Sequence, residues 1–208
     1  MPASLMTRRF AVGMAGLMAV LGGLLLLKHQ FLPAANPPTA YTQCPVAEAR
    51  YQHSADPHFS AQFIRPPHAA SAASPWLLLI KSPDQEYWFR FASSNGYGGI
   101  FLVPVHKPRP QTEEDGPEDI HPDTGAENAL TPYLEQLRFY PLDEQLRILD
   151  DPPQDGPGHE MAPKLLLMPE LGNLLWYEPG LLDGDTASPR QTLARGFFRL
   201  RTCARQTP

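Results

Sequence analysis

The stretch WLLLIKSPDQEYWFRFASSNGYGGIFLV, residues 76–103, decides the fold class. It contains three runs rich in apolar and aromatic residues, separated by Ser82-Pro83-Asp84 and by Asn95-Gly96. Asn-Gly supplies the positive φ that a tight hairpin turn requires. By strand alternation the middle run places three rings on one face, which we expect to be buried: Tyr87, Phe89 and Phe91. The stretch therefore predicts a three-stranded antiparallel meander.

Shorter runs elsewhere predict further strands. Residues 164–168, 174–177 and 197–202 are each short and bounded by glycine or proline. Residues 131–137 look instead like a helix start, with threonine as N-cap and proline at the first helical position. The 25 prolines among 208 residues disfavour long helices. We predict a mainly antiparallel β domain, with α+β as the alternative.

The first 43 residues predict a membrane anchor followed by a tether. Residues 10–27 are uncharged, and a helix of this length spans about 27 Å, close to the hydrocarbon thickness of a bilayer. Arg8 and Arg9 precede the run, so the positive-inside rule predicts a cytoplasmic N-terminus. The expected order is a cytoplasmic segment at 1–9, a single transmembrane helix at 10–28, a proline-rich tether at 29–43 and an extracytoplasmic domain at 44–208. Cleavage of the leader near Ala34-Ala35 is the alternative.

The two cysteines bracket the predicted extracytoplasmic domain. Cys44 follows the tether and Cys203 lies five residues before the C-terminus. An oxidising compartment permits a disulfide between them, which we predict, and a loop this long is worth on the order of 4–5 kcal/mol in the chain-entropy model. Two free thiols or a bond between two copies are the alternatives.

Charge is distributed unevenly along the chain. The formal net charge is −5, which does not indicate nucleic-acid binding. Residues 107–128 combine seven acidic residues with four prolines, and such a long loop in a compact domain is either functional or disordered. The C-terminal stretch is basic, and strand alternation aligns three arginines opposite Phe198 and Leu200: Arg195, Arg199 and Arg201. These arginines are candidate partner-binding residues. A solvated strand face, or pairing with the acidic loop, is the alternative.

No pattern in the sequence supports a catalytic centre. His53, His58 and His68 have neither helical i, i+4 spacing nor a zinc-hydrolase pattern. Asp119, His121 and Asp123 form an acid-rich cluster of the kind that binds calcium weakly. No EF-hand loop fits this cluster, because Pro117 falls on a ligand position of such a loop. There is no Gly-x-Ser-x-Gly elbow and no phosphate-binding loop ahead of a helix. We therefore assign no catalytic residue, metal, cofactor or small-molecule ligand. The aromatic residues expected to reach a surface are Trp88, Tyr97, Trp176 and Tyr177.

These observations lead to a hypothesis of location and role. The chain is expected to be a single-pass protein of a bacterial inner membrane, with its C-terminal domain in the periplasm and the lipid bilayer as partner of residues 10–28. There it would act as a binding or assembly module for another envelope protein, through an exposed sheet edge or through the acidic loop and the arginine strand. The alternatives are a membrane-tethered hydrolase or metal-dependent enzyme, and a cleaved soluble periplasmic protein.

Overall fold

The computed structural model describes residues 42–68, 70–93, 99–109, 116–121, 137–149, 151–154 and 161–203. These residues belong to one compact unit, Ala40–Pro208. The predicted anchor at 10–28, nearly all of the tether and the helix start at 131–136 lie outside the described residues. Within the described ranges, no helix combines the length and the apolar character needed to cross a bilayer.

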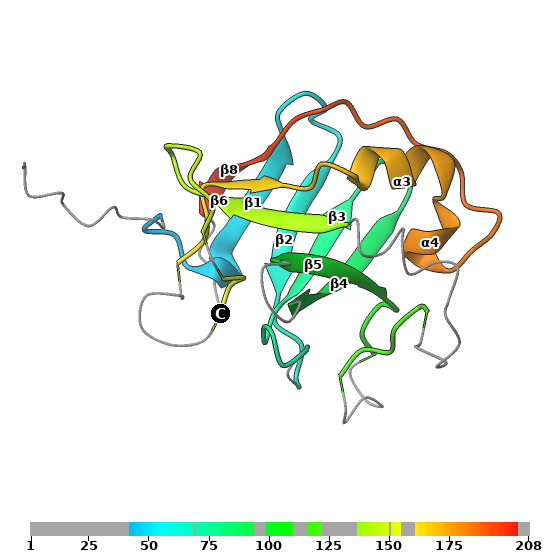
Figure 1. The fold of residues 1–208 in the computed structure, drawn as a ribbon, viewed down its shortest axis with the longest axis horizontal. Coiled ribbons are helices and arrows are strands. Elements are labelled where there is room, and N and C mark those ends of the chain that lie inside the picture. Colours follow the sequence, from blue (N-terminus) through cyan, green and yellow to red (C-terminus); the bar gives the residue numbers. More distant parts are fainter. Residues whose placement is uncertain are drawn as a thin grey trace, which may run out of the picture. The chain divides into compact units, whose positions relative to one another are not determined.

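The described chain forms a closed barrel in which each strand is antiparallel to both of its neighbours (Figure 1). The eight described strands follow one another around the barrel in sequence order, and β1 pairs with β8. They are β1 (Ala49–His53), β2 (Ser60–Ile64), β3 (Leu77–Lys81), β4 (Glu86–Ser93), β5 (Ile100–Val105), β6 (Arg138–Leu142), β7 (Leu165–Leu167) and β8 (Phe198–Cys203). The predicted antiparallel β architecture is thus confirmed. Every described strand has a hydrogen-bonded neighbour on both sides, so the described strands leave no unpartnered strand for the predicted capture at a sheet edge.

The predicted meander corresponds to β3, β4 and β5. Ile80 lies opposite Tyr87, and Leu78 lies opposite Phe89. The three rings assigned to the core face, on β4, are fully buried. Strand alternation therefore identified the interior of the barrel correctly.

Side chains fill the barrel interior. The rings of Phe63 and Phe91 stack with centroids 6.2 Å apart, and Phe139 meets Phe91 edge-on at 5.0 Å. Tyr51 meets Phe63 edge-on at 5.8 Å and donates its hydroxyl proton to the carbonyl of Pro163. An eight-stranded barrel has an interior just wide enough to be filled by side chains. This interior is accordingly a packed aromatic core.

Alternating strand directions give the barrel two different ends. The connections β1–β2, β3–β4, β5–β6 and β7–β8 lie at one end, which we call the helix end. It carries α3 (Leu171–Tyr177) and α4 (Gly180–Asp183), whose leucines cover the barrel core. The described chain begins and ends at the opposite end, together with η1 (Val46–Glu48) and the β6–β7 connection (Figure 1). We call this the disulfide end.

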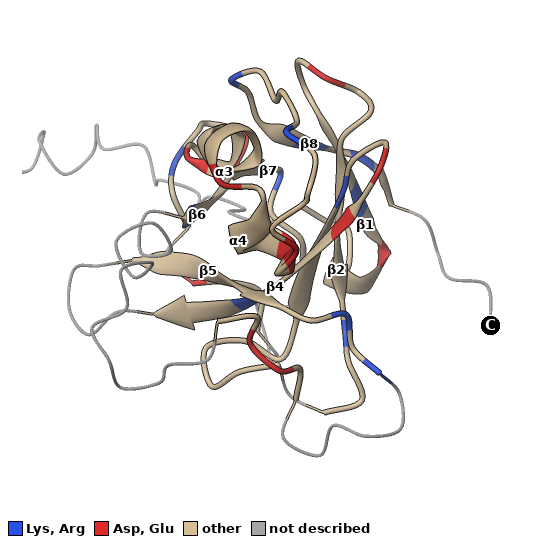
Figure 2. Cartoon of the chain, turned by 90° about the vertical axis from the view of Figure 1, so that its right-hand side faces the viewer, with Lys and Arg blue, Asp and Glu red and all other residues tan. Residues whose placement is uncertain are grey.

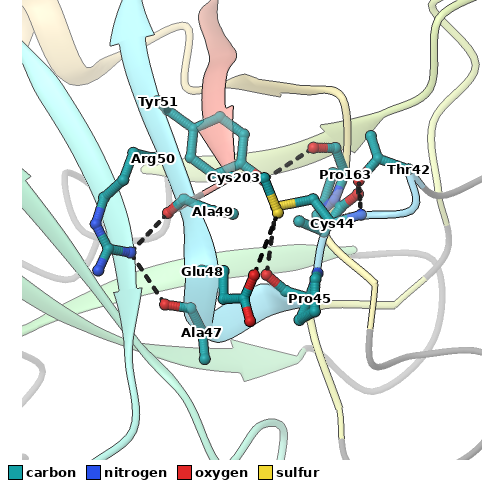
Figure 3. The surroundings of a disulfide bond; sticks show 11 residues. Thr42, Cys44, Pro45, Ala47, Glu48, Ala49, Arg50, Tyr51, Pro163 and Cys203 are labelled. Atoms are coloured by element: carbon teal, nitrogen blue, oxygen red, sulfur yellow. Dashed lines mark hydrogen bonds between the residues drawn. A yellow bond between two sulfur atoms is a disulfide. The ribbon is translucent and has the colours of Figure 1, made fainter. Parts of the chain in front are cut away.

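A disulfide joins Cys44 to Cys203 at the disulfide end (Figure 3). The Cα atoms are 5.6 Å apart, a separation typical of disulfides, and 159 positions separate the two residues in sequence. The bond lies where β1 and β8 close the barrel, because Ala49 is the register partner of Cys203. Beside it, Arg50 donates from its guanidinium to the carbonyls of Ala47 and Ala49 at 3.0 and 3.1 Å. The disulfide therefore secures the seam of the barrel.

Candidate functional site

A groove of about 760 Å³ crosses the helix end of the barrel. One side is formed by α3 and the segment that leads into it, and the other side by residues 192–196, which lead into β8. We call it the helix-end groove. Its lining residues are His53, Leu167, Met168, Pro169, Glu170, Gly172, Asn173, Trp176, Tyr177, Thr192, Leu193, Ala194, Arg195, Gly196 and Phe198.

Helix α3 contributes the aromatic side of the groove. Residues 174–177 were predicted as a strand, and this prediction was wrong. Leu171, Leu174 and Leu175 follow the i, i+3, i+4 spacing of a helix, and all three are buried against the barrel core. The two residues that follow are turned outward: Trp176 is 42% exposed and Tyr177 is 68% exposed. Burial of the leucines thus presents two large rings to solvent at the helix end.

The opposite side of the groove is anchored by Gln191. The backbone N–H of Gln191 donates to the carbonyl of Leu175 at 2.9 Å, and its side-chain amide donates to the hydroxyl of Tyr87 at 2.9 Å. Burial, with smaller contributions from Asp183 and Asp84, raises the pKa of Tyr87 to about 12, so this hydroxyl stays protonated at neutral pH. Gly172 permits the close approach of this segment to α3, since a Cβ there would lie 2.8 Å from the carbonyl oxygen of Leu193. These contacts fix residues 192–196 beside α3.

His53, at the end of β1, closes the floor of the groove. The residue is only 4% exposed, and its ring meets Phe198 edge-on with centroids 5.0 Å apart. Burial lowers the pKa of His53, opposed by the negative charge of Asp56. Nδ1 accepts the backbone N–H of Asp56 at 3.2 Å, so a neutral ring carries its proton on Nε2. A Cβ at Gly196 would lie 2.9 Å from Nε2, so only glycine fits against this edge of the ring. The groove therefore contains a buried neutral imidazole.

The three predicted partner-binding arginines lie at two different places on the domain. Arg195 lines the helix-end groove, whereas Arg199 and Arg201 lie exposed on β8, which carries blue segments of basic residues in Figure 2. Arg201 donates to the side-chain oxygen of Gln52 at 3.0 Å, and the guanidinium of Arg199 lies 6.0 Å from the ring centroid of Phe197. None of the three forms an ion pair with a carboxylate of the described residues. Their positive charges are therefore not neutralised within the described domain.

Part of the acidic segment 107–128 lies against the barrel. Only residues 107–109 and 116–121 of it are described. Asp119 accepts two hydrogen bonds from Arg90 on β4, at 2.6 and 2.7 Å, and hydrogen bonding to this carboxylate is the main reason that the pKa of Arg90 is raised. The backbone N–H of Ile120 donates to the carbonyl of Pro104 on β5. Asp119, one of the two described carboxylates of this segment, thus pairs with Arg90 and not with an arginine of the C-terminal stretch.

The structure separates one of the three histidines that an enzyme hypothesis would use. His53 and His58 lie at the helix end, the first buried and the second exposed in the β1–β2 connection, whereas His68 is exposed after β2 at the disulfide end. His121 contacts the carbonyl of Leu181 at 3.1 Å, while Asp123 lies outside the described residues. Among the residues that the structure describes, no three His, Cys, Asp or Glu side chains gather as a metal-binding group.

Sequence reasoning included Trp176 and Tyr177 among the aromatic residues expected at a surface but assigned them no site, and it missed the setting of His53. The available signal was the leucine spacing of α3, which directs the next two rings outward. Trp88 is only partly exposed, and Tyr97 lies outside the described residues.

Comparison of the chain with protein-family models, with curated proteins and with solved structures gives no match.

Proposed function

We propose that this protein is a binding module of the bacterial envelope that captures an acidic protein partner in the helix-end groove. The observation that carries the proposal is the set of side chains at the groove: Trp176, Tyr177 and Arg195. Tryptophan, tyrosine and arginine are the residue types most enriched among the energetically dominant residues of protein interfaces. A groove with two exposed rings beside an unpaired guanidinium matches this composition.

The charge of the region indicates the sign of the partner. Residues 190–201 contain four arginines and no acidic residue. The groove also contains one carboxylate, that of Glu170, which accepts a hydrogen bond from the side chain of Asn173 at 2.7 Å. Arginines at the edge of an interface steer an acidic partner toward it and reject a basic one. We therefore expect a partner that brings carboxylates to Arg195 and apolar side chains to the two rings.

The proposed location follows the sequence. Residues 10–28 anchor the protein in the inner membrane, with its barrel in the periplasm. The disulfide is consistent with this compartment, because disulfides persist in oxidising environments. In the topology of the barrel the described chain starts at the disulfide end, so the helix-end groove lies at the opposite end from the point where the tether joins.

Replacing both rings, Trp176→Ala with Tyr177→Ala, is expected to weaken partner binding at least about 30-fold, because an interface hot spot contributes about 2 kcal/mol or more. The partner is first isolated by cross-linking full-length protein in its native membranes, and its affinity is then measured for each variant. Phe101→Ala is the control, since it also removes a ring from the outer face of the barrel but lies on β5, outside the groove. Equal affinities for all three proteins would contradict the proposal.

A further inference from the structure

The β6–β7 connection presents two large apolar side chains to solvent at the disulfide end. Leu146 is 57% exposed and Ile148 is 58% exposed. Among the described residues, the other large apolar side chains with comparable exposure are Trp176 and Tyr177, at the helix end. Exposed apolar residues that gather at one place on a soluble surface indicate a contact site. We call residues 143–149 the apolar turn.

The apolar turn is held in a fixed conformation. The carboxylate of Asp143, which is 2% exposed, accepts the backbone N–H groups of Gln145 and Arg147 at 2.8 and 2.9 Å. The same carboxylate accepts the guanidinium Nε–H of Arg147 at 2.7 Å. Leu146 has φ 63°, a left-handed conformation that a leucine rarely adopts. Such strain persists only where the surroundings enforce it, and it concentrates at functional sites.

The charges around the apolar turn are paired with one another. Asp143 binds Arg147, and Glu144 lies 3.2 Å from the ammonium nitrogen of Lys164. Each acidic residue of the turn therefore has a basic partner, and among the described residues the nearest exposed carboxylate without an ion pair, that of Asp151, lies beyond the buried Leu149. This composition fits an apolar surface better than a strongly charged protein partner.

Hydrogen bonds place the apolar turn close to the point where the chain enters the domain. Ala162 donates its N–H to the carbonyl of Cys44 at 2.7 Å and accepts the N–H of Thr42 at 3.1 Å. Two residues later, Lys164 donates its N–H to the carbonyl of Leu142 at 3.0 Å. Residues 161–164 thus run between the first described residues and the base of the turn. Figure 1 shows the yellow-green turn and the blue start of the described chain at the same side of the barrel.

We propose that Leu146 and Ile148 insert into the bilayer and dock the disulfide end of the barrel on the membrane surface. This inference rests on the anchor of the proposed function. Even a fully extended chain of residues 29–41 spans only about 45 Å, so the tether keeps the barrel within this distance of the anchor. Tethering at this range gives an effective concentration in the millimolar range, which favours even weak contacts with the bilayer.

Docking gives the barrel an orientation. With the disulfide end on the lipid, the helix end points away from the membrane. The helix-end groove is then presented to the periplasm at the far side of the barrel. The partner of this surface is therefore the lipid interface, and its attraction is apolar and nearly independent of salt.

The test places a tryptophan in the turn. The full-length protein carrying Ile148→Trp is reconstituted into phosphatidylcholine vesicles that contain a lipid brominated on its acyl chains, and the tryptophan fluorescence is compared with that of the unaltered protein. Leu146→Trp is the second variant, and Tyr177→Trp is the matched control at the helix end. We expect the bromolipid to quench at least about half of the fluorescence added at position 148 or 146, at low and high salt, and little of that added at position 177.

Flotation of the same vesicles tests the membrane anchor separately from the docking of the turn. If the full-length protein floats with the vesicles but tryptophans at 146 and 148 are quenched no more than one at 177, docking is wrong while the anchor stands. If the protein does not float with the vesicles, both the anchor and the docking are wrong. A third outcome combines two measurements. If the turn is protected from an aqueous quencher in native membranes but is not quenched by bromolipid in pure vesicles, a protein covers the turn, and the inference is overturned.

Discussion

Replacing Phe91 by alanine is expected to lower the free energy of unfolding by about 3–5 kcal/mol, the usual cost of removing a buried phenylalanine from a core. Phe91 is fully buried on β4 and lies between the rings of Phe63 and Phe139. Its removal leaves a cavity at the centre of the barrel, because strands closed into a barrel collapse little around a lost ring. Urea unfolding of the purified protein in mild detergent measures the change.

Phe101→Ala is the matched control for this experiment. Phe101 lies on β5, where Phe101 is the register partner of Ala92 and its neighbour Leu102 is the register partner of Phe91, so strand alternation puts it on the outer face. It is only partly buried, and its replacement is expected to cost much less than that of Phe91. Similar losses for the two variants would contradict a packed aromatic interior.

Removing the disulfide is expected to lower the free energy of unfolding by about 2–5 kcal/mol, as is common for native disulfides. The bond closes a loop with a sequence separation of 159 and lies beside the β1–β8 seam, the last pairing needed to close the barrel. The double variant Cys44→Ser with Cys203→Ser is compared with the unaltered protein by urea unfolding, with and without reductant.

Reductant provides an internal control for this comparison. It is expected to bring the unaltered protein to the stability of the double variant and to leave the double variant unchanged. Identical unfolding midpoints for the two proteins without reductant would show that the bond contributes no stability.

Local signals in the sequence were sufficient to predict the meander of β3 to β5. Its strands alternate apolar and polar residues, and its turns contain proline, asparagine and glycine, so the pattern needs no information from the rest of the chain. Strand β1 was missed because Ala49, Tyr51 and His53 are its buried residues, and a histidine before several prolines resembles a loop. Closure of the barrel depends on pairing β1 with β8, about the full length of the domain apart, and short patterns carry no information on such contacts.

The groove was less predictable than the barrel. The run Leu174-Leu175-Trp176-Tyr177 is too short to distinguish a strand from a helix, and only inclusion of Leu171 reveals the helical spacing. Arg195 was chosen for its charge and does line the groove, whereas its neighbours on β8 lie outside it. The other parts come from distant segments: His53 from β1, and residues 192–196 from the connection before β8. These segments lie side by side only because the strands close into a barrel.

The most direct test of the account is site-specific photo-crosslinking of the full-length protein in its native membranes. A photoreactive amino acid at position 177 probes the helix-end groove, and one at position 146 probes the apolar turn. We expect a covalent adduct with a protein from position 177, which is lost when Arg195→Glu is added, and no adduct with that protein from position 146. The same adduct from position 146 and none from position 177 would contradict it, because the binding surface would then lie at the disulfide end.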